Sequence, residues 1–359
     1  RINYFFINSN KKNEKGVCKM KKIILCITLL LLLTGCTQDN KEVVNILNWS
    51  SYIPDEVIRD FEKEYGIKVN YSTYSSNEEC LAKLSSAKEG TYDLVFPSDY
   101  MIELMIKRNL IQKLDKSKLN NLVNINYNYL NYNYDYYNEY SLPFLAATVV
   151  LVYDSEKIKD DITSYNDLLD SKYKGEIILL DDQRVVIGMA FMALGYDMND
   201  TDSDHLEEAK DWLLKLKENV KAFDSDSPKT FMISKETSIG VIWNAEAALA
   251  MEENKNLKVV YPSEGFSVSI DNFAIPKGAK NIDNAYLFID YILEGKVMQK
   301  IIESYPYKNV NLETQNYLSD TYLDNNASNI SDLMFSTGSF VENIGDKIEL
   351  YDKVWAEIK

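Results

Sequence analysis

An alternation of apolar strand-like runs and amphipathic helical runs, beginning at residue 43, most constrains what this chain can fold into. Residues 43–47 and 67–71 have the composition of strands, and residues 54–65 between them repeat apolar side chains at the spacing of one helix face. Residues 77–89 follow as a second helix and residues 92–96 as a third strand. This order of strands and helices predicts an open α/β sheet.

The same order restarts after about residue 148, with strands predicted over 176–180 and 239–243 and helices over 183–194, 204–219 and 245–253. Two extended apolar stretches, 149–153 and 268–275, lie at the junctions and suit strands that cross from one lobe to the other and back. The sequence therefore predicts two α/β lobes joined by a hinge. We assign residues 43–147 and 274–320 to the first lobe, and residues 148–273 and 321–359 to the second.

The N-terminal region has the pattern of an export signal. A basic stretch opens at Met20, an apolar run covers residues 23–33, and Leu-Thr-Gly precedes Cys36. The apolar run is too short to span a bilayer as a helix. The pattern is similar to the signal of bacterial lipoproteins, in which the cysteine is acylated and becomes the first mature residue; an ordinary cleaved signal is the alternative. We expect a signal peptide over 20–35 and a membrane tether over 36–42.

Residues 1–19 do not fit a signal peptide and contain no methionine. The segment Lys15-Gly16-Val17 can be back-translated into a purine-rich ribosome-binding sequence a few bases upstream of a start codon at Met20. We interpret residues 1–19 as an untranslated upstream extension of the reading frame.

The composition excludes several classes of protein. With 46% hydrophobic residues among 359, the chain has enough apolar material for two globular lobes and is neither a disordered tail nor a fibre. Its 55 acidic residues against 39 basic ones give a formal charge of -16. That balance disfavours a nucleic-acid partner, which needs a basic face, and weakly favours cationic ligands.

Metal and disulfide sites are not expected. Cys18 and Cys26 precede the predicted cleavage point and Cys36 would be acylated, which leaves Cys80 alone. The single histidine, His205, lies in a polar stretch at the start of a predicted helix, where we expect a solvated side chain. The sequence therefore predicts no metal and no cofactor.

Catalytic signatures are also missing, since the chain has no nucleophile-elbow, zinc-protease, P-loop or dinucleotide motif. The adjacent pair Asp181 and Asp182 could suggest a glycosidase. However, neighbouring strand residues point to opposite faces, so at most one of them enters a given cleft. We expect no enzymatic activity. Residues 124–140 carry seven tyrosines, which could form a stacking platform, but we interpret them as a tolerant surface segment of an AT-rich gene.

Aromatic residues stand beside hydroxyl or carboxylate residues at several predicted strand ends, where open α/β sheets bind ligands. These residues are Trp49, Ser50, Ser51, Tyr52, Ser98, Asp99, Tyr100, Asp181, Asp182, Trp243 and Asp271. Aromatic faces attract cations by roughly 0.5 to 2 kcal/mol each, and methylene groups pack well on rings. Such a set suits an alkyl chain that carries ammonium groups.

Six blocks give a specific resemblance: residues 48–54, 61–78, 92–101, 114–119, 242–244 and 271–276. Together they resemble the spermidine/putrescine-binding proteins of polyamine ABC importers, and the similarity extends over nearly all of residues 43–359. The resemblance implies a two-lobed periplasmic-binding-protein-like fold of type II. It also implies that a polyamine is held between the lobes and that the loaded, closed form is presented to a membrane permease, a role that a monomer can fill.

The resemblance also implies which side chains touch the ligand. Aromatics of the first lobe are Trp49, Tyr52 and Tyr100, with Ser50 and Ser98 as polar neighbours. Trp243 matches the aromatic wall of the second lobe, Asp182 and Asp271 match carboxylates that bind ammonium groups, and Ser225 and Tyr305 match further contacts. Asp99 is a candidate for an additional charge, with an exposed helix N-cap as its alternative role.

Three positions depart from the family pattern and leave the cargo open. Val185 stands where a second glutamate is frequent, Ser269 where a tryptophan is usual, and Val341 where a glutamine can occur. One alternative is a protein of the same fold that binds iron or an amino acid, which would need tyrosinate ligands or an arginine such as Arg184. We interpret Arg184 instead as a residue that orients carboxylates. An enzyme or an adhesin on the same scaffold is the remaining alternative.

Overall fold

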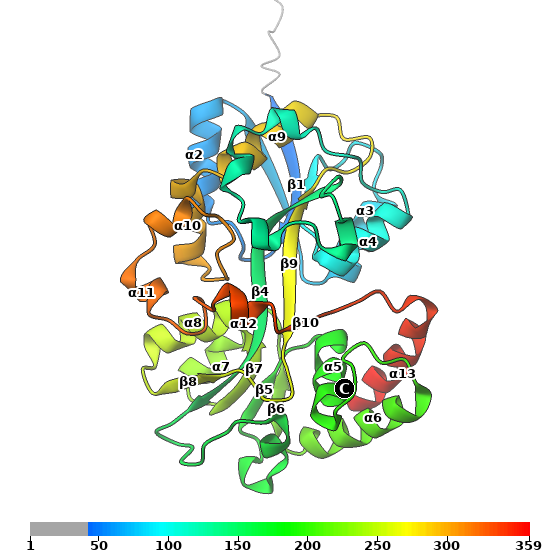
Figure 1. Ribbon diagram of the computed structural model, residues 1–359, viewed down its shortest axis with the longest axis vertical. Helices are drawn as coiled ribbons and strands as arrows, with labels where there is room; N and C mark the ends of the chain where they lie inside the picture. The colour runs from blue at the N-terminus through cyan, green and yellow to red at the C-terminus, as the bar shows by residue number, and fades with distance from the viewer. Residues whose placement is uncertain (1–41) are drawn as a thin grey trace, which may run out of the picture. The chain divides into compact units, whose positions relative to one another are not determined.

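The computed structural model describes residues 42–359 (Figure 1), and the structural statements below concern that part of the chain. The predicted upstream extension, the signal peptide, the lipidation site Cys36 and nearly all of the tether lie outside the described residues.

The first lobe is built on three parallel strands. It contains β1 (Val43–Trp49), α2 (Asp55–Tyr65), β2 (Lys68–Tyr74), α3 (Asn77–Ser86), β3 (Leu94–Val95) and α4 (Asp99–Lys107). Strand β1 pairs in parallel with β2 on one side and β3 on the other. Helix α2 buries Val57 and Phe61 against this sheet and ends at Gly66, whose φ of 70° suits a residue without a side chain. The loops that follow β1 and β3 lie at the carboxyl ends of these parallel strands, where ligands bind in such folds.

The second lobe repeats this architecture. It contains β5 (Ile177–Leu179), α5 (Gln183–Leu194), α6 (Ser203–Lys217), β6 (Val220–Phe223), α7 (Lys229–Ile233), β7 (Ile239–Trp243), α8 (Asn244–Glu253) and β8 (Leu257–Val260). Strand β5 pairs in parallel with β6 and β7. The apolar core of this lobe lies between the strands and α5, whose residues 184–192 are all buried.

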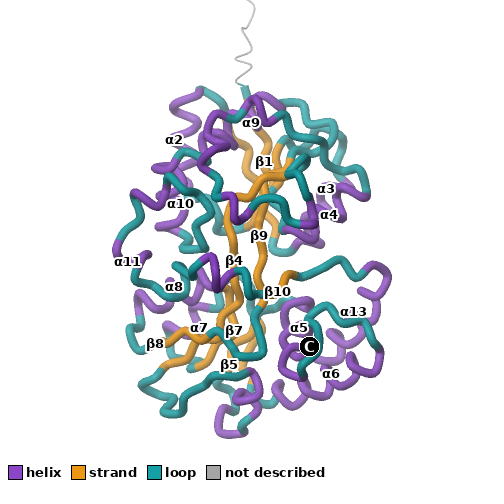
Figure 2. The backbone as a smooth tube through the Cα atoms, viewed as in Figure 1, coloured by secondary structure: helices purple, strands orange, loops and turns teal. Residues whose placement is uncertain are grey.

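Two long strands connect the lobes: β4 (Ser141–Asp154) and β9 (Ser267–Ala274), which we call the hinge strands. They pair antiparallel with each other, and the far half of β4 then pairs with β7 and β8. The described strands therefore form one continuous ten-stranded sheet rather than two separate ones. Figure 2 shows the hinge strands running through the middle, with helices flanking both lobes. Strand β4 starts at Ser141, eight residues before the predicted start at residue 149. Pro143 cannot donate a hydrogen bond to a neighbouring strand, and it lies where the register between β4 and β9 shifts.

The C-terminal region returns to both lobes. Helices α9 (Ile282–Ile292) and α10 (Gly295–Ser304) complete the first lobe, and α11 (Asp320–Leu323), α12 (Asp332–Phe335), β10 (Ser339–Phe340) and α13 (Ile348–Ile358) follow. Tyr322 packs into the apolar core of the first lobe, whereas Tyr351 and Ile358 pack into that of the second. Between α12 and α13, strand β10 pairs in parallel with β9. The predicted lobe boundaries stay a prediction, and the packing of Tyr322 supports a last crossing that follows residue 322.

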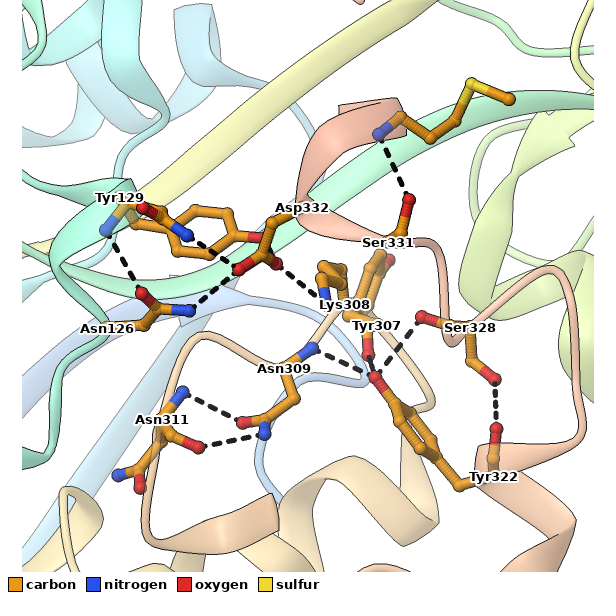
Figure 3. Close-up of polar contacts among 12 residues, drawn as sticks. Asn126, Tyr129, Tyr307, Lys308, Asn309, Asn311, Tyr322, Ser328, Ser331 and Asp332 are labelled. Atoms are coloured by element: carbon orange, nitrogen blue, oxygen red, sulfur yellow. Dashed lines mark hydrogen bonds and ion pairs between the residues drawn. The ribbon is translucent and has the colours of Figure 1, made fainter. Parts of the chain in front are cut away.

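A polar network fixes α12 to the first lobe (Figure 3). The carboxylate of Asp332 accepts hydrogen bonds from Asn126 Nδ2 at 3.0 Å, Asn128 Nδ2 at 2.9 Å and Tyr129 Oη at 2.8 Å. The ammonium of Lys308 lies 3.2 Å from the same carboxylate. Burial opposes ionisation, but these hydrogen bonds and the Lys308 charge hold the pKa of Asp332 at about 2. The segment before the last crossing is therefore anchored by a charged group.

The tyrosine-rich segment is only partly the tolerant surface that its composition suggested. Tyr127, Tyr136 and Tyr137 are exposed, as expected. Tyr129 is fully buried and bonded to Asp332, and the hydroxyl of Tyr134 donates to Asn272 Oδ1 on the hinge strand β9 at 3.1 Å. The interpretation of residues 124–140 as a tolerant surface segment was therefore wrong for Tyr129 and Tyr134. The base composition of a gene can explain why tyrosines are frequent, but it does not determine which of them become buried.

Candidate functional site

A cavity of about 400 Å³ lies between the two lobes, within the size range of small-molecule sites. The structure brings all eleven predicted site residues to its lining: Trp49, Ser50, Tyr52, Ser98, Asp99, Tyr100, Asp182, Ser225, Trp243, Asp271 and Tyr305. The three positions that depart from the family pattern, Val185, Ser269 and Val341, line the same cavity. Residues far apart in the sequence therefore meet there, and their roles in binding stay a prediction.

Asp271, on hinge strand β9, is held by two hydroxyl groups of the first lobe. Tyr52 Oη donates to Oδ2, and Ser98 Oγ donates to Oδ1 at 2.6 Å. Asn77 fixes the serine in turn, since its Nδ2 donates to Ser98 Oγ at 3.1 Å. The aspartate is 3% exposed, and burial raises its pKa to about 6 despite the two hydrogen bonds. The fold thus keeps a carboxylate in a position where ionisation is costly without a cation.

Asp99 does not occupy an exposed N-cap, which corrects that alternative. It is 2% exposed and forms the first residue of α4, and Ser98 precedes the helix. Its Oδ2 accepts from the backbone amide of Ile270 and its Oδ1 from that of Tyr100, both at 2.7 Å. Burial raises the pKa of Asp99 to about 7. The carboxylate therefore connects α4 to the hinge strand as well as lining the cavity.

The aromatic wall of the first lobe is fixed by its own contacts. Trp49 Nε1 donates to the carbonyl of Phe96 at 2.9 Å, and its ring lies 4.7 Å from that of Tyr74. The rings of Tyr52 and Tyr307 lie 4.9 Å apart. Tyr307 lines the cavity but was missed from the sequence, although it follows the predicted Tyr305 by two residues.

The opposite wall comes from the second lobe. Asp182 caps α5, because its Oδ1 accepts from the amide of Val185 at 3.0 Å, and burial raises its pKa to about 6. Asp181 and Asp182 follow β5 instead of lying within a strand, so the argument from alternating faces does not apply. Both line the cavity, but Asp181 pairs with Lys359 at 2.9 Å. Ser225 Oγ is buried and has no hydrogen-bond partner within residues 42–359.

Arg184 does not orient a carboxylate by direct contact, which corrects our interpretation. Its guanidinium donates to the carbonyl of Glu342 and to Asn199 Oδ1, each at 2.9 Å, and lies over the ring of Tyr351 at 5.0 Å. These contacts hold the C-terminal segment beside the second lobe. The arginine was buried by packing that no local sequence pattern reveals.

Other chemistry has little support in the described part of the chain. No cluster of His, Cys, Asp and Glu there could hold a metal ion. His205 lies outside the cavity lining; its ring stacks on Tyr196 at 3.8 Å, and its Nδ1 lies 2.7 Å from Asp200 Oδ2. Cys80 is a buried free thiol. From residue 42 onward, none of the helices has both the length and the apolar character needed to cross a bilayer.

Comparison with known proteins identifies the family. The family model for bacterial extracellular solute-binding proteins matches residues 56–328. The chain belongs to this family. It is 36% identical over 332 residues to the spermidine/putrescine-binding periplasmic protein of Salmonella typhimurium, covering 92% of this chain and 95% of that one.

Solved structures agree with this assignment. A Listeria monocytogenes protein assigned to spermidine/putrescine ABC transport superposes with a TM-score of 0.84 at 33% identity, covering 88% of this chain and 98% of that chain. A Treponema pallidum lipoprotein superposes with a TM-score of 0.80 at 26% identity, covering 89% and 99%. These findings confirm the predicted resemblance and the predicted two-lobed α/β fold class.

Proposed function

We propose that this solute-binding protein captures a polyamine, spermidine or putrescine, in the cavity between its lobes and delivers it to the permease of an ABC importer. One observation carries the proposal. Asp271, which is buried, and Asp182, which is partly buried, line the cavity and receive hydrogen bonds from hydroxyl or amide groups, with no ion pair to a lysine or arginine in the described structure. A ligand that brings ammonium groups would supply the missing positive charge.

The geometry suggests how capture proceeds. The rings of Trp49, Tyr52 and Trp243 line the cavity beside the carboxylates, so the methylene chain can pack on aromatic faces while the ammonium groups meet the acids. Bending at the hinge strands would bring the lobes together and remove water from these contacts. The protein acts as a binding component and catalyses no reaction.

A different cargo on the same fold is less well supported. An amino acid needs a cation for its carboxylate, and the guanidinium of Arg184 is already bound to Glu342 and Asn199. Ferric iron favours tyrosinate, but burial and nearby carboxylates raise the pKa of Tyr52 and of Tyr100 well above 10. Burial also raises the pKa of the two other cavity tyrosines, Tyr305 and Tyr307, so all four are neutral at physiological pH.

We propose further that the mature protein is exported as a monomer and held at the outer face of a bacterial membrane by acyl chains on Cys36. The Leu-Thr-Gly-Cys sequence and the lipoprotein from Treponema pallidum support this part. Metabolic labelling with a palmitate analogue tests it. Label in the wild-type chain but not in Cys36→Ser is expected, and equal label in both would contradict it.

Calorimetric titration of residues 37–359, which include the whole compact unit Val43–Lys359, tests the cargo. Spermidine and putrescine are the ligands, with arginine and ferric citrate as controls. Micromolar or tighter binding of a polyamine, without binding of the controls, is expected. Absence of heat with both polyamines, for protein shown to be folded and ligand-free, would contradict the proposal.

A further inference from the structure

We infer that Glu78 is a further cation-binding side chain of this site, and that it acts from the first lobe together with Asp182 of the second. The inference rests on the proposed capture of a polyamine and adds to it a residue that holds one ammonium group from the other side of the cleft. Neither the charge pattern nor the carried-over site residues singled out Glu78.

Glu78 has the position and the freedom that this role requires. It is the second residue of α3, lines the cavity, and accepts a hydrogen bond from Tyr100 Oη at 2.9 Å. Within residues 42–359 it forms no ion pair. The next residue, Glu79, differs on each point: it pairs with Lys83 at 2.7 Å, accepts from the backbone and hydroxyl of Ser75, and does not line the cavity. Glu79 therefore stabilises the start of α3, whereas Glu78 faces the cleft.

Asp182 belongs to the opposite wall of the same cavity. Burial raises the pKa of Asp182 and that of Tyr100, and the charge of Glu78 raises both further. Glu78, Tyr100 and Asp182 line one cavity, and the hydroxyl of Tyr100 is bonded to Glu78. The guanidinium of Arg184, a residue that also lines the cavity, is bound to Glu342 and Asn199, and no lysine or arginine in the described structure forms an ion pair with Glu78 or Asp182.

Two carboxylates on opposite lobes repel each other when the cleft narrows without a ligand. An ammonium group placed between them converts that repulsion into two attractions. The pair would thereby couple closure to the presence of a cation. It would also supply the negative charge that Val185 does not provide on the second lobe.

The competing role for Glu78 is indirect, since it could merely hold the hydroxyl of Tyr100. Four proteins distinguish the two roles: the wild-type chain, Glu78→Gln, Tyr100→Phe and the double variant. Glu103→Gln is the matched control, because it removes the same charge from α4, the helix that carries Tyr100, and Glu103 pairs with Lys107 away from the cavity lining. Spermidine and putrescine affinities are measured for each by calorimetry, with circular dichroism to verify folding.

Direct binding predicts at least a tenfold loss of affinity for Glu78→Gln, a similar further loss when the change is made in Tyr100→Phe, and less than a twofold loss for Glu103→Gln. A loss that disappears in the Tyr100→Phe background, or an affinity of Glu78→Gln within twofold of wild type, would overturn the inference while leaving polyamine capture intact. Absence of polyamine binding by the wild-type chain would overturn both.

Discussion

The two walls of the cleft differ in how firmly their polar groups are held. On the first-lobe side, Tyr52 and Ser98 donate to Asp271, and the indole of Trp49 donates to a backbone carbonyl. On the second-lobe side, Ser225 Oγ is buried and has no hydrogen-bond partner in the described structure. A wall whose groups are already positioned can receive a ligand at low entropic cost, whereas a wall with unpaired groups gains its hydrogen bonds when the ligand arrives. Under the proposed function, we therefore expect the ligand to dock first on the first lobe and the second lobe to close over it.

The largest expected effect comes from Asp271→Asn. The substitution keeps the volume but removes the charge, and it replaces one of the two accepting oxygens by an NH2 donor, so the hydrogen bond from either Tyr52 or Ser98 loses its acceptor in this geometry. We expect polyamine affinity to fall by at least 100-fold, and by about tenfold or more for Asp182→Asn, where asparagine still caps the helix. Calorimetry measures both. Unchanged affinity in the two variants would refute the assigned site.

Lowering the pH should reduce polyamine binding by the carboxylates of both walls, Asp182 and Asp271. The pKa values of Asp182 and Asp271 are raised to about 6 by burial, so at pH 5 each is about 10% ionised and must release a proton to bind a cation. We expect affinity to fall by about tenfold per carboxylate between pH 7.5 and pH 5. Titration in buffers of different ionisation enthalpy would detect the released protons, and an affinity independent of pH would contradict the prediction.

The same groups should make the stability of the ligand-free protein depend on pH in the opposite direction. Their pKa values in the folded state lie above the ordinary value of 3.8, so between those two values the native state binds more protons than the unfolded state. Their contribution to the free energy of unfolding is therefore lost as the pH rises through about 6. Thermal unfolding of Asp271→Asn, compared with wild type from pH 5 to 7.5, should show a smaller decline of stability across that range.

A pair of serine variants compares the walls directly. Ser98→Ala removes a donor to Asp271 and a partner of Asn77, so we expect it to lower both the melting temperature and the polyamine affinity. Ser225→Ala removes a hydroxyl that has no partner in the described structure, so ligand-free stability should not fall, while affinity should fall by about two- to tenfold. Equal behaviour of the two variants in both measurements would remove the distinction between the walls.

The smallest effect on affinity is expected outside both walls, at Asp332. Asp332→Asn weakens the four contacts that fix α12 to the first lobe, and we expect the free energy of unfolding to fall by about 1 to 3 kcal/mol. Polyamine affinity should stay within twofold of wild type. Denaturant unfolding and calorimetry test the two parts, and a large loss of affinity at unchanged stability would show that the network controls closure instead.

Much of this molecule follows from its sequence for identifiable reasons. Helix α5, predicted over 183–194, has those bounds in the structure, because Asp182 caps its start and Gly195 ends it. Most of the lining residues were found because they stand at or just after the end of a strand of an open α/β sheet, whereas Ser225 and Tyr305 were found through the family resemblance alone. Among the features that escaped prediction are the early start of β4, the direction of the Arg184 side chain and the burial of Tyr129. Each depends on tertiary partners distant in sequence, Asn272, Glu342 and Asp332, which no local pattern specifies.

The last passage of the chain from the first lobe to the second has a practical consequence. The described fold begins at Val43 in the first lobe and ends on α13 in the second, so its two ends belong to different lobes (Figure 1). Donor and acceptor fluorophores attached at those ends would report lobe closure as a change in energy transfer. The native topology thus provides the layout of a genetically encoded sensor, one that could follow its ligand in living cells without any label placed in the cavity.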